Sequence, residues 1–167
     1  LSLNSVFKRA EEEIAFLKKF NIIPLLFTDK DYPQRLKHCE DSPVLLYVKG
    51  NVDFNLPKAI AVVGTRKSTA YGRKFCKELV YQLASPNLLI ISGLALGIDG
   101  YAHSAALETN TPTVGVLAHG LDRIYPHSHR ELAANMLKNG AILSEFPVKT
   151  KPDRENFPRR NRIIAGM

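Results

Sequence analysis

The sequence has little cysteine, no long apolar run and, over one stretch, no acidic side chain. Its two cysteines, Cys39 and Cys76, are far apart and lack metal-ligand spacing, which argues against a disulfide scaffold and suits a reducing compartment. The longest apolar run, residues 88–98, is too short to cross a bilayer and is interrupted by glycines. The first residues show no signal-peptide pattern. These absences predict a cytoplasmic protein without a membrane-spanning segment.

An excess of positive charge is the main feature of the composition. The chain has a formal net charge of +7 and a pI near 9.5. Residues 58–74 hold several lysines and arginines and no acidic side chain. Such a balance favours an anionic partner, but it does not distinguish nucleic acid from a nucleotide or an acidic surface.

Three segments of the chain differ in pattern. Residues 1–20 contain apolar side chains at helical spacing over 5–20, which predicts an amphipathic helix that is the remnant of a helical module or a clasp against the main domain. Residues 21–57 are punctuated by prolines, which predict an irregular strap with one or two short strands. Residues 58–167 form the core domain.

Short apolar segments alternate with helical patterns in the core domain. Continuous apolar strands that alternate with helices are typical of a parallel sheet covered on both faces. With right-handed crossovers, the pattern predicts a Rossmann-like, doubly wound α/β domain. The expected strands are 59–63, 88–92, 113–117 and 141–144, and the expected helices are 70–84, 99–108 and 128–138.

The turn after the first expected strand is a candidate phosphate site, because ligands of such sheets bind beyond the carboxyl ends of the strands. A glycine is followed by two cations, and Ser68 or Thr69 then caps a helix. Free backbone N–H groups, a helix N-terminus and positive charge together favour phosphate binding. The alternative is a tight turn whose glycine only provides conformational freedom. The residues of the turn are Gly64, Thr65, Arg66 and Lys67.

Other familiar chemistry is absent or weak. The turn lacks both the G-x-G-x-x-G of dinucleotide-binding proteins and the second glycine of the NTPase phosphate loop, so hydride transfer and nucleotide hydrolysis lose their main support.

Ser92 and Gly93 begin a small-residue stretch that either admits a ligand or eases packing. Asp99 and His103 share a helix face, either as an acid–base pair or, as we favour, as a capping Asp and a structural His. No metal site is predicted from the later histidines His119, His127 and His129, which lack partners at ligand spacing.

The segment after the fourth expected strand is the second concentration of cations. Within residues 149–162, basic side chains greatly outnumber Asp153 and Glu155. Arginines interleaved with aromatic rings suit a nucleic acid single strand, because rings stack on exposed bases while guanidinium groups follow phosphates. The alternative is a solvated charge run, which we disfavour because the arginines adjoin an apolar helical start at 163–167. The basic members are Lys149, Lys151, Arg154, Arg159, Arg160 and Arg162, and the aromatic residues are Tyr125, Phe146 and Phe157.

The ordered motifs VVGTRKST, SGLALGIDGYAH, GLDRIYP, LSEFP and NFPRRNRIIAGM closely resemble the DprA/Smf family, the DNA-processing proteins of bacterial natural transformation. The upstream segments DYPQRL and DSPVLLYVKG are similar to the family's approach to its domain, so the resemblance covers residues 22–167. It implies a protein that is not an enzyme, binds and protects single-stranded DNA, and passes the strand to the RecA recombinase. It also implies a homodimer, and no cofactor or metal is expected.

The resemblance further implies which residues contact DNA. By position, the family's first-loop arginine falls on Arg66 and the basic residue before its F-P-x-R-N-R motif falls on Arg154. The family's domain continues beyond the position of Met167, so we expect the sheet to be incomplete here and much of the dimer surface to lie in the following part. The remaining implied members of the site are Gly64, Ser92, Gly93, Arg159, Arg160, Asn161 and Arg162.

Two alternative functions remain open. A nucleotide-binding enzyme of the N-glycosidic hydrolase type, on a phosphate-binding Rossmann-like fold, would use a later glycine-rich loop with a catalytic glutamate. These 167 residues contain no such loop. A scaffold that binds any phosphate would not distinguish single-stranded from double-stranded DNA.

Overall fold

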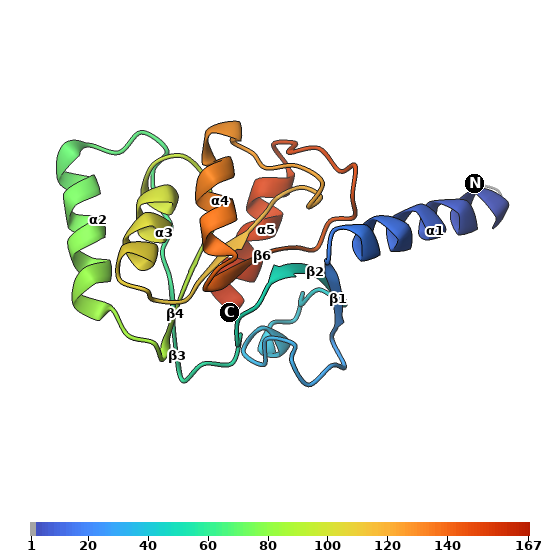
Figure 1. Cartoon of the computed structure of the whole chain (residues 1–167), viewed down its shortest axis with the longest axis horizontal. Coiled ribbons are helices and arrows are strands. Elements are labelled where there is room, and N and C mark those ends of the chain that lie inside the picture. The colour runs from blue at the N-terminus through green and yellow to red at the C-terminus, as the bar shows by residue number, and fades with distance from the viewer. Residues whose placement is uncertain (1–2) are drawn as a thin grey trace.

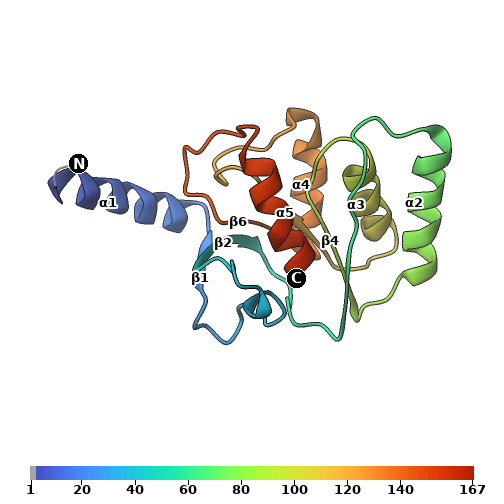
Figure 2. The ribbon, with the colours of Figure 1, turned by 180° about the vertical axis from the view of Figure 1, so that it is seen from behind.

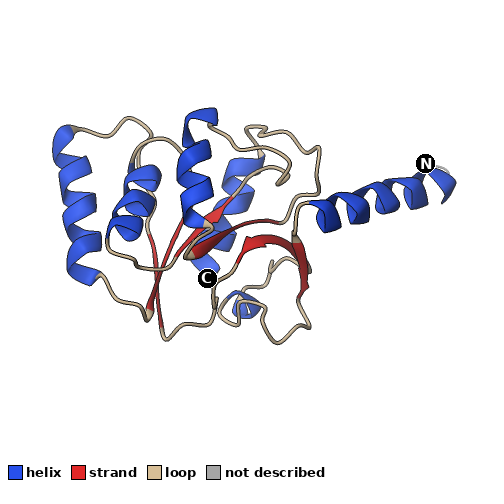
Figure 3. Cartoon of the chain, viewed as in Figure 1, coloured by secondary structure: helices blue, strands red, loops and turns tan. Residues whose placement is uncertain are grey.

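The computed structural model describes residues 3–167 and centres on one six-stranded sheet (Figure 1). Its strands are β1 (Ile23–Leu26), β2 (Leu45–Gly50), β3 (Lys58–Ala61), β4 (Leu88–Ser92), β5 (Thr113–Val116) and β6 (Gly140–Ser144). They lie in the order β1-β2-β6-β5-β4-β3. Strands β3 to β6 are parallel, as predicted, whereas β1 and β2 of the strap continue the same sheet as antiparallel strands (Figure 3).

Helices cover both faces of the sheet. They are α1 (Leu3–Lys19), α2 (Ala70–Leu83), α3 (Ile98–Glu108), α4 (Arg130–Met136) and α5 (Asn156–Gly166), with 3-10 turns η1 (Leu36–His38) and η2 (His127–His129). Helices α2, α3 and α4 pack on one face, and α5 and η1 pack on the other (Figures 1 and 2). This arrangement confirms the predicted α/β class. The helix expected at 128–138 starts as η2 and continues as α4.

Strand β4 illustrates why the apolar runs become central strands. All of its residues are buried. Leu89 and Ile91 pack toward α5, while Leu88 and Ile90 pack toward α2 and α3. A strand between two covered faces needs apolar side chains at successive positions rather than at alternate ones. The sheet core therefore follows directly from the continuous apolar pattern.

Helix α1 extends away from the body of the molecule (Figures 1 and 2). The helix itself was predicted, but the apolar side chains Val6, Phe7 and Ile14 of its predicted face are exposed. Leu17 is buried in the cluster around α4, and Glu13 is also buried. The assignment of this segment to a helical module stays a prediction. None of the helices within residues 3–167 is both long and apolar enough to cross a membrane.

Replacing Leu143 by alanine tests the centre of the sheet. Leu143 lies on β6 and is 0% exposed. Such a truncation leaves a cavity and should lower the free energy of unfolding by about 2–5 kcal/mol. Denaturant unfolding followed by circular dichroism measures the loss. Val44→Ala, at a side chain that is 73% exposed, is the control, and equal effects of the two changes would contradict the proposed core.

Candidate nucleic-acid interface

The loops that follow the parallel strands meet at one edge of the sheet, the upper edge in Figure 1. The N–H of Ile98 donates to the Thr65 carbonyl at 3.2 Å, which joins the loop after β4 to the turn after β3. Gly97 has a φ of +82°, and a Cβ at this position would overlap with the Thr65 carbonyl. Only glycine fits here without strain. The predicted meeting of these two loops is therefore present.

The turn after β3 keeps its predicted residues at the surface. All residues of 64–67 are exposed. The N–H of Lys67 donates to Thr65 Oγ1 at 3.2 Å, and the N–H of Gly72 donates to Thr69 Oγ1 at 3.1 Å. Thr69 is thus the cap of α2, as one of the two expected residues. The N-terminus of α2 lies next to two exposed cations, which is the arrangement expected of a phosphate site.

Helix α5 begins at Asn156, well before the apolar start at 163–167 that the sequence suggested. Pro158 lies in its first turn, where a missing N–H breaks no helical hydrogen bond. Residues 159–162, which precede the helical start suggested by the sequence, are therefore helical. Successive side chains on a helix point about 100° apart. The predicted cluster 159–162 thus faces several different surroundings rather than one pocket.

Arg160 points into the protein and joins α5 to the ends of β4 and β5. Its side chain is buried, and Nη1 donates to the carbonyls of Gly93 and Val116. Gly93 makes this possible, because a Cβ there would overlap with the guanidinium group. Burial lowers the pKa of Arg160 to about 10, while Asp99 opposes this change. The Arg160 guanidinium remains charged at neutral pH. Because it is buried, it holds α5 against the strand ends and is not exposed to a ligand.

Ser92 and Asp99 are also buried and bonded within the protein. Ser92 Oγ donates to the Val62 carbonyl at 2.5 Å. Asp99 Oδ2 accepts from the N–H groups of Gly93 at 3.2 Å and Ala95 at 3.4 Å, and burial raises the pKa of this carboxyl group. Asp99 therefore fixes the loop after β4. It does not cap α3, because the N-cap position is Gly97 and no side chain makes a capping bond there, so the capping role that we favoured is wrong.

The other members of the predicted cluster separate into surface and structural residues. Arg162 pairs with Glu145 and with Asp41 of the strap, so it lies away from the turn after β3. Arg159 is exposed, with its guanidinium carbon 5.5 Å from the centroid of a ring beneath it, that of Phe146. Asn161 is exposed as well. Only part of the expected group is thus positioned to meet a ligand.

Exposed cations come together at this edge with two aromatic rings, of which Tyr125 is exposed and Phe157 is half-buried. The guanidinium carbon of Arg66 lies 4.8 Å from the Phe157 ring centroid, and the Tyr125 ring centroid lies 6.3 Å from that of Phe157. Arg154 is exposed just before α5. We refer to the following side chains as the strand-end surface: Arg66, Lys67, Tyr125, Arg154, Phe157 and Arg159.

Behind the strand-end surface lies a cavity of about 40 Å³. Its walls come from the ends of β4 and β5, from α5 and from the Tyr125 loop, and they include Leu96, Leu117 and His119. Within residues 118–126, which follow β5, the sequence had singled out only Tyr125 as a residue that could meet a strand. The position of this segment directly after β5 could have identified it as part of the site, because ligands of parallel sheets bind beyond the carboxyl ends of the strands.

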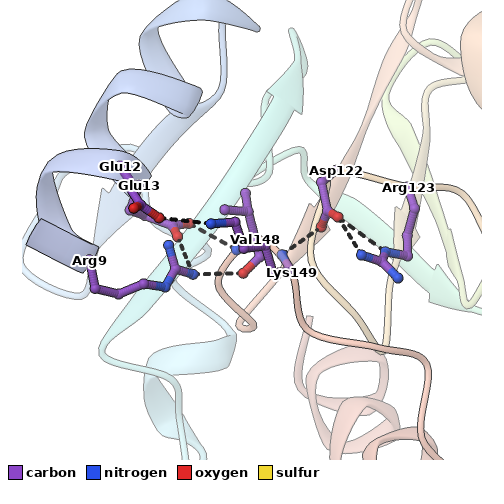
Figure 4. A network of polar contacts seen from close by, with 7 residues as sticks. All are labelled: Arg9, Glu12, Glu13, Asp122, Arg123, Val148 and Lys149. Atoms are coloured by element: carbon purple, nitrogen blue, oxygen red, sulfur yellow. Dashed lines mark hydrogen bonds and ion pairs between the residues drawn. The ribbon is translucent and has the colours of Figure 1, made fainter. Parts of the chain in front are cut away.

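The loop that precedes α5 is held by α1 (Figure 4). Glu13 Oε1 accepts from the N–H of Val148 at 2.9 Å, and Arg9 donates to the Val148 carbonyl at 2.7 Å. Arg9 and Glu13 also pair with each other at 2.8 Å. These contacts satisfy both backbone groups of Val148, so α1 fixes the path of the chain from β6 toward the strand-end surface.

Lys149, one of the predicted basic residues, is neutralised by the same network (Figure 4). Its Nζ pairs with Glu12 at 2.7 Å, and this contact lowers the pKa of the Glu12 carboxyl group. The N–H of Lys149 donates to Asp122 Oδ1 at 2.9 Å, and Asp122 also pairs with Arg123 at 2.7 Å. Lys149 therefore contributes little free positive charge to the edge of the sheet.

The later histidines do not gather around a common point. His129 Nδ1 lies 3.0 Å from the Leu94 carbonyl, His127 is exposed, and His119 lines the cavity. Throughout residues 3–167, no group of three or more His, Cys, Asp or Glu side chains is placed to hold a metal ion.

Stability should fall in acid because of His103. This side chain is fully buried on α3, and its Nδ1 lies 2.7 Å from Thr113 Oγ1, whose hydroxyl donates to the Ile90 carbonyl at 3.0 Å. Burial lowers the pKa of His103 from 6.5 to about 3. Between these values the unfolded chain binds a proton that the folded protein does not, so lowering the pH should cost up to about 1.4 kcal/mol per unit.

Urea unfolding at pH 7 and pH 5 measures this dependence. His103→Gln should remove the histidine contribution to the slope, even if it also lowers stability at pH 7. Val44→Ala, at a side chain that is 73% exposed and cannot titrate, is the control and should leave the slope unchanged. Identical slopes in the wild type and in His103→Gln would show that the buried ring does not titrate as argued.

Together, the fold and the site define a Rossmann-like α/β domain with a cationic and aromatic surface at the carboxyl ends of its parallel strands. A family profile described as DNA recombination-mediator protein A matches residues 24–167. The chain belongs to this family, which comprises the DprA and Smf proteins that its motifs resemble.

Named relatives share this similarity over most of the chain. DNA processing protein DprA of Bacillus subtilis is 41% identical over 148 residues, which cover 88% of this chain and 49% of the relative. Protein Smf of Escherichia coli is 40% identical over 161 residues, which cover 96% of this chain and 43% of the relative. The chain therefore spans about half the length of these relatives or less.

Two solved structures have the same fold. DprA from Streptococcus pneumoniae superimposes with a TM-score of 0.78 at 38% identity, over 92% of this chain and 54% of that one. DprA from Helicobacter pylori superimposes with a TM-score of 0.78 at 30% identity, over 88% of this chain and 66% of that one. The work on the Helicobacter protein concerns its unique mode of binding single-stranded DNA.

Proposed function

We propose that the chain binds single-stranded DNA along the strand-end surface. The observation that carries this proposal is the contact between Arg66 and the Phe157 ring, with the Tyr125 ring beside it. Guanidinium groups pair with phosphates, and exposed rings stack on unpaired bases. In a duplex the base faces are covered by their neighbours, so this combination favours an unpaired strand. The similarity to the Helicobacter protein supports the proposal.

The roles of the individual residues follow from their placement. The turn 64–67 and the N-terminus of α2 suit one phosphate, and Arg154 and Arg159 suit phosphates further along the strand. Ser92, Gly93 and Arg160 act from beneath by holding the loop after β4 and helix α5 in place.

Replacing Arg66 by alanine should weaken single-strand binding roughly tenfold, because a charge-assisted contact to phosphate is lost. With the cations of the strand-end surface neutralising about four phosphates, the log–log salt slope of the wild type should be about −3 and should become shallower in the variant. Fluorescence anisotropy of a labelled oligonucleotide over a salt series measures both quantities.

Lys58→Ala is the matched control, because it removes the same charge at the other end of β3. It should change the affinity at fixed salt by no more than about twofold, and it should leave the salt slope of binding almost unchanged. Equal weakening by the two variants would mean that DNA responds to net charge alone, and the proposed surface would be wrong. Duplex DNA of the same length, measured at the same salt, should bind more weakly than the single strand.

We further propose that the full-length protein protects the bound strand in the cytoplasm, acts as a homodimer and passes the strand to the RecA recombinase. The family description as a recombination mediator supports this role. RecA filament formation on single-stranded DNA, followed with and without the full-length protein, should start sooner with it. Light scattering gives the mass of that protein in solution, and a monomer with no effect on RecA would refute this part.

Binding without catalysis is the simplest use of the site. Asp99 and His103, the acid–base pair that the sequence offered, are both buried and bonded within the protein. Incubation of the full-length protein with nucleoside monophosphates should therefore release no free base, and release that depends on Asp99 would overturn this view.

A further inference from the structure

The loops that follow β5 and β6 are joined to each other by two backbone contacts. The N–H of Lys149 donates to Asp122 Oδ1 at 2.9 Å, and the N–H of Gly120 donates to the Thr150 carbonyl at 3.2 Å. We call these four residues the loop junction. One loop continues to Tyr125 and the other to α5, so a change at the loop junction reaches both sides of the strand-end surface.

Lys149 has a backbone conformation that a lysine seldom adopts. Its φ is +71°, in the left-handed region, where the Cβ of any residue except glycine is crowded by the backbone. Such a conformation persists only while surrounding contacts fix it. The loop junction therefore has an alternative arrangement with less backbone strain, in which Lys149 is extended.

Helix α1 supplies part of the contacts that hold Lys149 in this conformation (Figure 4). Arg9 donates to the Val148 carbonyl at 2.7 Å, and the N–H of the same peptide unit, that of Lys149, donates to Asp122. This peptide unit is thus bonded on both sides, which fixes the φ of Lys149. Glu13 Oε1 holds the preceding peptide unit by accepting from the N–H of Val148 at 2.9 Å.

The docking of α1 depends on few groups. Glu13 and Leu17 are the only buried residues among those described in α1, and Val6, Phe7 and Ile14 are exposed. An element with few buried contacts opens locally at a lower free energy than the core does. The contacts at Val148 can therefore be broken and remade while the sheet stays folded.

A chain of hydrogen bonds leads from the loop junction to the start of α5. The Lys151 carbonyl accepts from the N–H of Asp153 at 2.9 Å and from Asn156 Nδ2 at 3.2 Å. The Asp153 carbonyl accepts from the N–H of Asn156 at 3.1 Å. Arg154 lies within this bonded segment, so its position follows that of Lys149.

We propose that Glu13 is a positioning residue for single-strand binding, and that docking of α1 and binding of the strand favour each other. The inference rests on the proposed single-strand binding and adds a control element far from the bound strand. The element with two states is the backbone at Lys149, which α1 holds in the left-handed form. By linkage, α1 strengthens DNA binding by the same factor by which DNA strengthens the docking of α1.

Replacing Glu13 by alanine in the full-length protein should weaken binding of labelled oligo-dT by about threefold to tenfold. Charge alone predicts the opposite sign, because the change removes a carboxylate from a protein that binds a polyanion. Glu11→Ala, at an exposed position on α1, removes the same charge and should bind as tightly as the wild type or slightly more tightly. Glu13→Gln keeps an acceptor for the N–H of Val148 and should retain most of the affinity.

Hydrogen exchange of the Val148 N–H in the wild type measures the docking directly, because this group donates to Glu13. Exchange should slow on addition of oligo-dT by about the factor lost in Glu13→Ala. The N–H of Phe27, bonded to the Val44 carbonyl at 2.9 Å, is the control and should not respond. Adding Lys149→Asn to Glu13→Ala should restore part of the affinity, since asparagine adopts the left-handed conformation more readily than lysine.

Unchanged or tighter binding by Glu13→Ala, or equal weakening by Glu11→Ala, would overturn the inference. Should Glu13→Ala fail to fold, the exchange measurement on the wild type decides, and an unchanged rate for Val148 with bound oligo-dT would refute the coupling. These outcomes differ from a failure of the proposed function, in which the wild type does not bind oligo-dT and Arg66→Ala has no effect.

Discussion

The site depends on the burial of Arg160 against the ends of β4 and β5. A guanidinium group taken out of water costs several kcal/mol unless it is paired and hydrogen bonded. The carbonyls of Gly93 and Val116 accept from it, and the charge of Asp99 opposes the effect of burial. Because both the hydrogen bonds and the missing Cβ of Gly93 are specific to one geometry, this contact fixes the position of α5 and its rotation about its own axis.

The rotation of α5 determines which side chains reach solvent. With Arg160 turned toward the sheet, Phe157 lies one turn earlier on the same face and forms a wall of the cavity beside it. Arg159 is turned outward, and Arg162 is turned toward Asp41 of the strap and pairs with Glu145, which follows β6. One buried contact therefore assigns three neighbouring cations to three different roles.

Much of the fold could be predicted because it follows from local pattern. Strand β4 is apolar throughout, which indicates a central parallel strand, and a parallel sheet carries its site at the carboxyl ends. The place of β1 in the sheet was harder to predict, since Pro24 discourages a strand and is tolerated only because β1 lies at the edge. The first residue of α5 was also difficult to predict. Glu155 at the N-cap position makes no side-chain capping bond, and Pro158 suggests a helix break. The sequence was read as a run of cations, without the helix that contains them. It therefore could not show that Arg159, Arg160 and Arg162 point in different directions.

The positive charge that is available to a ligand at this edge of the sheet is smaller than the sequence suggests. The number of lysines and arginines within residues 149–162 overstates the free charge at the site, since Lys149 is paired with Glu12 and Arg162 with Glu145. In the proposed binding mode, the remaining exposed cations act on phosphates, which are the same in every sequence and whose contribution is screened by salt. The affinity expected of this edge therefore depends on which cations the fold leaves unpaired there, and not on how many cations the sequence contains.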